Sequence, residues 1–248
     1  MLFAVIGCES AGLLFTKDGE IECGGDGKAI ILDNNPDATN PTFDELIAFI
    51  IKDSTDVKNY IKNGPNAYVC SDFAEEVHNN AEAAGITAGW VGITFLGTEE
   101  GHAINAFETT DKGLVYIDCT NGRNSTNELT EAQSWDTIAY IKIGNKYGII
   151  HVDRAESLDY NYYVEYDKEW QDYRKLLEQY NEEVDRYNEE ISGKIYTIGS
   201  PEERSITTWK EQLEEQEEIV GNLERELGSY WYESEFSLNV VKNVKIHW

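Results

Sequence analysis

The chain has 248 residues, of which 41% are apolar and 12% aromatic, which is enough to form a substantial core and excludes an intrinsically disordered protein. Acidic residues outnumber basic residues by 47 to 20, and the net charge of −27 argues against binding to nucleic acid or anionic membrane surfaces. No apolar run reaches the length of a transmembrane span, and the four cysteines lack the CxxC spacing of a zinc knuckle and are too few for a disulfide scaffold.

The N-terminus is a short apolar run, Met1 to Gly7, that ends at Cys8. This pattern is typical of the end of a lipoprotein signal, in which a small residue precedes a cysteine that becomes lipidated. The run has no basic segment before it and is shorter than a usual signal, so a first strand packed in the core is an equal alternative. The lipoprotein interpretation predicts an extracellular or cell-surface protein anchored at Cys8; the alternative leaves a cytoplasmic location open.

The next segments are predicted to be short strands and bracing helices. Extended pieces are expected over residues 13–15, 20–23 and 28–32, separated by glycine-rich turns that lack the pattern of a phosphate-binding or calcium-binding loop. Thr42 and Glu45 have the spacing of a capping box and predict the start of a helix. A second short helix is expected over residues 57–62.

A cysteine lies where the next loop turns into a helix. Asn66 is expected to cap this helix, and Gly85 suits the position just past its end. Cys70 therefore lies in the first turn, where unpaired N–H groups and the helix dipole favour a thiolate. Small and apolar residues recur on one face of the helix at Phe73, Ala74, Val77, Ala81 and Ala84. A buried structural cysteine is the alternative interpretation of Cys70.

Three strands are expected after this helix, over residues 88–95, 102–108 and 114–118. His102 begins the second strand and Asp118 ends the third, and Asp111-Lys112-Gly113 makes the tight turn between them. Because antiparallel neighbours bring the start of one strand beside the end of the next, we expect His102 and Asp118 to face each other. Cysteine, histidine and aspartate then have the arrangement of a thiol nucleophile, its base and the group that orients the base.

These motifs carry a resemblance to a known family. Cys70-Ser71-Asp72-Phe73-Ala74, Gly101-His102-Ala103 and Val115-Tyr116-Ile117-Asp118-Cys119-Thr120 resemble the core of the transglutaminase-like superfamily, relatives of papain-like cysteine peptidases. The resemblance covers about residues 60 to 121. It implies an α+β fold with N-terminal helices packed on an antiparallel sheet. The chain departs from the family pattern at Ser71, Ile104 and Cys119, which leaves the substrate open.

The resemblance implies an acyl-transfer enzyme without a cofactor or metal. Cys70 is expected to attack a protein or peptide carboxamide and form a thioester, with His102 as base and Asp118 as its orienting group. The backbone N–H of Cys70 and the hydroxyl of Tyr68 are candidate oxyanion donors, although the ring of Tyr68 is also suited to core packing. Hydrolysis is favoured over cross-linking to an amine. A Cys70–Cys119 disulfide and a metal site of Cys70, His102 and Cys119 are competing interpretations.

The remaining chain is predicted to form a hairpin, a helical insertion and a last strand. Strands over residues 137–143 and 147–152 join at Gly144-Asn145. Residues 159–234 carry two heptad seams with acidic outer faces, which predicts an antiparallel coiled-coil hairpin. The last strand, within residues 235–248, is expected to return to the core formed by residues 1–158. An alternative function is a catalytically inactive scaffold whose helical hairpin binds a protein partner.

Overall fold

The computed structural model describes residues 12–13, 22–120, 136–227 and 239–248. The fold is α+β, with a six-stranded antiparallel sheet and, within the described residues, four α-helices. The chain divides into two compact units, one formed by Met1–Tyr160 with Tyr232–Trp248 and the other by Asn161–Trp231. The boundaries between the units lie between residues 160 and 161 and between residues 231 and 232. The sequence predicted boundaries between residues 158 and 159 and between residues 234 and 235. The lipoprotein prediction for Cys8 lies outside the described residues.

The six-stranded sheet is built mainly from strands that follow one another in the chain. Its order is β7-β6-β5-β4-β3-β8, and every neighbouring pair is antiparallel. The C-terminal strand pairs with β3 at one edge, which confirms its predicted return to the main sheet. The strands are β3 (Gly89–Phe95), β4 (Gly101–Thr109), β5 (Gly113–Asp118), β6 (Thr137–Tyr140), β7 (Gly148–His151) and β8 (Val241–His247).

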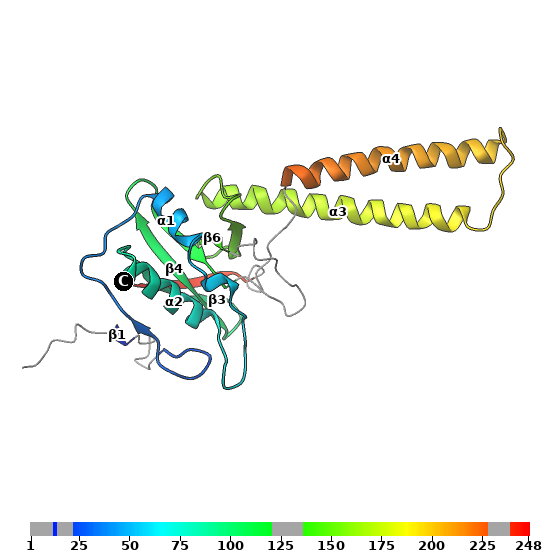
Figure 1. The fold of residues 1–248 in the computed structure, drawn as a ribbon. Helices are drawn as coiled ribbons and strands as arrows, with labels where there is room; N and C mark the ends of the chain where they lie inside the picture. Colours follow the sequence, from blue (N-terminus) through cyan, green and yellow to red (C-terminus); the bar gives the residue numbers. More distant parts are fainter. Residues whose placement is uncertain (1–11, 14–21, 121–135, 228–238) are drawn as a thin grey trace, which may run out of the picture. The chain divides into compact units, whose positions relative to one another are not determined.

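Helix α2 (Cys70–Ala83) lies across this sheet, against β3 and β4 (Figure 1). Its apolar face is buried, and the Asn105 amide of β4 donates to the Ala74 carbonyl at 2.8 Å. The helix ends before Gly85, whose φ of 82° is the left-handed conformation expected there. The predicted cap was wrong. Val69 is the N-cap residue instead of Asn66, so Cys70 is the first residue of the helix.

The N-terminal segments brace this helix and sheet. Helix α1 (Phe43–Ile50) begins with the predicted capping box of Thr42 and Glu45. The expected helix over residues 57–62 was wrong: the 3₁₀-helix η1 (Thr55–Val57) ends where that helix was expected to begin, and Ile61 exchanges two backbone hydrogen bonds with Tyr68 in an extended bridge. These long-range bonds use the backbone groups that a helix would need. Two short strands, β1 (Gly12–Leu13) and β2 (Ile31–Leu32), pair antiparallel.

The second unit contains two long helices, α3 (Tyr160–Ile191) and α4 (Pro201–Leu227). The beginning of α3 packs against the end of α4 through Trp170 and Val220. The end of α3 packs against the beginning of α4, with the rings of Tyr187 and Trp209 5.4 Å apart. The pair is therefore antiparallel, as predicted. None of the helices in the described part of the chain is long and apolar enough to cross a membrane.

Candidate active site

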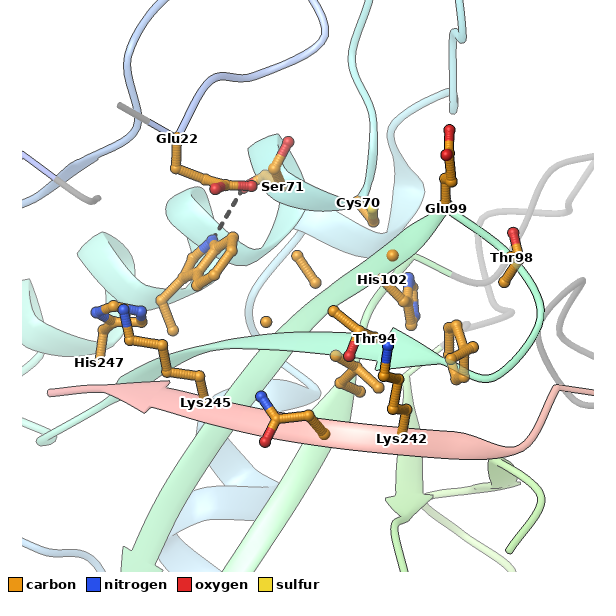
Figure 2. Close-up of a pocket in the computed structure, with 17 residues that line it drawn as sticks. Glu22, Cys70, Ser71, Thr94, Thr98, Glu99, His102, Lys242, Lys245 and His247 are labelled. Carbon is orange, nitrogen blue, oxygen red and sulfur yellow. Dashed lines mark hydrogen bonds between the residues drawn. The ribbon is translucent and has the colours of Figure 1, made fainter. Parts of the chain in front are cut away.

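Cys70 opens onto a cleft beside the sheet. The cleft has a volume of about 860 Å³, and Trp90 is among the residues that line it. The half-buried Cys70 lies at its wall together with His102 (Figure 2). As the first residue of α2, Cys70 has a backbone N–H without an acceptor within the helix. The sulfur and this donor are therefore side by side at the positive end of the helix dipole.

A carboxylate fixes the first turn of α2. Asp72 Oδ2 accepts hydrogen bonds from the backbone N–H groups of Val69 and Gly25, both at 2.8 Å. Gly24 approaches this side chain so closely that a Cβ there would lie 1.9 Å from Asp72 Oδ1. Asp72 thus ties the N-terminal loop to the turn that carries Cys70.

His102 and Asp118 form a buried hydrogen-bonded pair. Strands β4 and β5 pair Asn105 with Ile117, so the next residue, Asp118, lies opposite Ile104. Ile104 is two positions from His102 on β4, and the side chains of His102 and Asp118 are therefore on the same face of the sheet. The two side chains are thus diagonal neighbours rather than directly opposed. His102 Nε2 lies 2.7 Å from Asp118 Oδ2, and both side chains are almost fully buried.

Two groups that the sequence did not single out also hold Asp118. The hydroxyl of Tyr147 donates to Asp118 Oδ2 at 2.6 Å, and the Tyr147 ring packs edge-on against the His102 ring with a centroid separation of 5.4 Å. The backbone N–H of Thr120 donates to Asp118 Oδ1 at 2.9 Å, and the Thr120 hydroxyl donates to the same oxygen. A tyrosine directly before a buried strand indicates that its hydroxyl needs a hydrogen-bond partner, but the sequence does not show which partner.

These contacts determine the charge of the pair. Burial lowers the pKa of His102, but the charge of Asp118, the hydrogen bond to it and the neighbouring Cys70 side chain raise this pKa to about 10. Burial raises the pKa of Asp118, and His102, Thr120 and Tyr147 more than offset this, so that this pKa lies below its ordinary value. Both shifts favour the charged forms, an imidazolium beside a carboxylate. Because Nε2 faces Asp118, Nδ1 is the ring nitrogen that can exchange a proton with the Cys70 thiol.

Cys119 takes no part in this arrangement. Its side chain is buried, and burial, followed by the charge and hydrogen bond of Asp136, raises the pKa of its thiol well above the usual value. Cys70 and Cys119 are both thiols, so the alternative of a disulfide between them was wrong. Over the described ranges, no three His, Cys, Asp or Glu side chains are grouped so that they could hold a metal ion.

Tyr68 lies away from the thiol chemistry. Its hydroxyl donates to Glu76 Oε2 at 2.5 Å, and its ring packs edge-on against Phe73 with centroids 4.6 Å apart. The hydroxyl is thus directed along α2 toward Glu76 instead of toward an acyl oxygen at Cys70. This geometry corresponds to the core-packing alternative, and the backbone N–H of Cys70 is the oxyanion donor that we retain.

Comparisons of the chain with protein-family models, with curated proteins and with solved structures found no match. The resemblance to transglutaminase-like proteins therefore stays a prediction, and what the protein does must be inferred from the chemistry of the site.

Proposed function

We propose that this protein is a transglutaminase-like cysteine acyl-transfer enzyme that acts on protein or peptide carboxamides through a thioester. One observation carries the proposal. A buried His102–Asp118 pair interacts with Cys70, which lies at a helix N-terminus and opens onto a cleft. A structural cysteine needs neither a charged histidine beside it nor access to a cleft, so the arrangement favours a nucleophile.

In the proposed reaction, the Cys70 thiolate attacks the carbonyl carbon and the carbonyl oxygen becomes an oxyanion near the N–H of Cys70. His102 gives its proton to the leaving amine as the carbon–nitrogen bond breaks, which leaves a thioester on Cys70. His102 then takes a proton from water, the resulting hydroxide attacks the thioester, and the acid product leaves. Asp118 keeps the ring oriented and stabilises its charged form throughout.

Hydrolysis is the outcome that we propose, because water is always present at an open cleft. An amine that reaches the same thioester first gives a cross-linked product instead. The two outcomes share every step up to the acyl-enzyme, so one assay covers both.

The test is to incubate wild-type protein, Cys70→Ala and Cys23→Ala with peptide libraries and a tagged primary amine, and to analyse products by mass spectrometry. We expect wild type and Cys23→Ala to release amine products and to form a thioester at Cys70, and Cys70→Ala to do neither. Turnover that persists in Cys70→Ala, or no acyl-enzyme in any variant across the library, contradicts the proposal.

One observation favours the second candidate, a scaffold whose helical hairpin binds a protein. Ile195 and Ile198, in the link between α3 and α4, are 99% and 94% exposed. Two nearly fully exposed isoleucines so close in the chain offer apolar surface that a protein partner would cover. The same assay separates the candidates, because a scaffold forms no thioester at Cys70.

A further inference from the structure

One wall of the cleft beside Cys70 is formed by the edge strand β8. Four polar side chains of this strand line the cleft. Two of them are lysines, and Figure 2 shows both at this wall. These side chains are Lys242, Asn243, Lys245 and His247. The chain as a whole has 47 acidic and only 20 basic residues, so two lysines on one wall of the candidate active site differ from the general surface.

A β-bulge brings Lys242 to this wall. In the regular part of the pairing, Gly92 is opposite Lys245 and Thr94 is opposite Asn243. The register then shifts, and Phe95 pairs with Val241, so Lys242 is the extra residue on β8. Val241 is fully buried in the hydrophobic core. Strict alternation would turn Lys242 away from the side of Asn243, whereas the bulge allows Lys242 to line the cleft with it.

The two lysines differ in their surroundings. Lys245 interacts with a carboxylate. Burial raises the pKa of Glu22, and the positive charge of the neighbouring Lys245 opposes this rise. Glu99 lines the cleft as well. Lys242 is exposed, and no carboxylate in the described part of the chain forms an ion pair with it. Its ammonium group is therefore available to a charged group that enters the cleft.

We propose that the cleft recognises a carboxylate of the substrate through Lys242, so that the preferred substrates carry an acidic group close to the carboxamide that Cys70 attacks. This inference rests on the proposed function in taking Cys70 as the reactive group. A lysine ammonium is a point charge with three donors and pairs well with a carboxylate at the rim of a cleft. An acidic side chain and the C-terminus of a peptide both supply this chemistry.

The first test needs no turnover. Iodoacetate and iodoacetamide alkylate a thiolate by the same displacement of iodide, but only iodoacetate carries a carboxylate. The ratio of their rates at Cys70 is measured by peptide mapping in wild type, Lys242→Gln and Lys242→Glu. Lys112→Gln is the matched control, because it removes the same charge from an exposed turn that does not line the cleft. Cys23 in the same protein reports the intrinsic preference of an exposed cysteine for the two reagents.

We expect the iodoacetate-to-iodoacetamide ratio at Cys70 to fall about fivefold in Lys242→Gln and further in Lys242→Glu, and to stay unchanged in Lys112→Gln. Iodoacetamide alone should react equally in all variants. A ratio that does not depend on Lys242, or that falls equally in Lys112→Gln, overturns the proposal. Because alkylation does not require acyl transfer, loss of the proposed function would leave this result interpretable.

The second test identifies the source of the carboxylate by comparing matched peptide substrates. If Asp→Asn beside the carboxamide lowers kcat/KM in wild type but not in Lys242→Gln, the side chain is recognised. If amidation of the C-terminus has that effect, the chain terminus is recognised. Equal kcat/KM for acidic and neutral forms of both kinds contradicts the proposed preference.

Discussion

Replacing Tyr147 by phenylalanine removes one hydroxyl from the centre of the site. This hydroxyl donates to Asp118 Oδ2 at 2.6 Å, and the tyrosine is fully buried, so water cannot take its place. Hydrogen bonds to charged groups contribute about 1.5–3 kcal/mol to stability. His102 and Thr120 still hold the carboxylate. We therefore expect Tyr147→Phe to lower the free energy of unfolding by about 1.5–3 kcal/mol. If half of this is lost in the transition state, turnover should fall about four- to thirteenfold.

The assay is urea denaturation followed by tryptophan fluorescence between pH 3 and pH 8. Tyr147 helps to lower the pKa of Asp118, so the stability from this carboxylate is present above its unfolded-state value and is lost as pH falls through the lower folded value. Without the hydroxyl, this loss should begin at a higher pH. Tyr140→Phe is the control, because its hydroxyl donates at 2.6 Å to the neutral Ser157 carbonyl. Unchanged stability and an unshifted acid limb in Tyr147→Phe would refute the reasoning.

Three further predictions concern other groups. Burial lowers the pKa of His102 and Asp118 raises it, to about 10 overall, so the stability that the charged ring contributes is complete below about pH 6.5 and is lost as pH rises toward 10. Urea denaturation at a series of pH values should show this loss in wild type and not in His102→Gln. An equal decrease of the unfolding free energy with pH in both proteins contradicts this prediction. Gly24→Ala should cost about 1–3 kcal/mol through its clash with Asp72 and much less in an Asp72→Ala background, whereas additive effects in this double-mutant cycle contradict the clash. Gly221→Ala should stabilise α4 by about 1 kcal/mol, because the new Cβ contacts only the flexible Arg225 side chain; circular dichroism melting of the full chain measures this, and a lower midpoint contradicts it.

The central contacts of the site were predictable because they depend on local chain geometry. A tight turn at Asp111-Lys112-Gly113 joins β4 to β5, so the positions of His102 and Asp118 on one face follow from counting along the two strands. A helix with Cys70 in its first turn was also predictable from periodicity, although its cap is Val69 and not Asn66, and the return of β8 was predictable from an extended apolar pattern after the helical pair.

Other features depended on contacts that a sequence pattern does not carry. Tyr147 reaches Asp118 from a different hairpin, and Asn66 had good capping chemistry but lost the cap position because Asp72 holds the N–H of Val69. The bulge at Lys242 arises where the burial of Val241 competes with regular alternation, which appears only once β8 is paired with β3. Long-range packing decided each of these cases.

The central claim is that His102 makes Cys70 a nucleophile, and the pH dependence of iodoacetamide alkylation at each cysteine tests it most directly. In wild type, we expect Cys70 to remain reactive at pH 6, at least about tenfold faster than Cys23, while Cys119 reacts only after unfolding because burial raises the pKa of its thiol. In His102→Gln, the advantage of Cys70 over Cys23 at pH 6 should disappear. If Cys70 follows the same pH dependence as Cys23 in wild type, or keeps its reactivity at pH 6 without His102, the proposed site is contradicted.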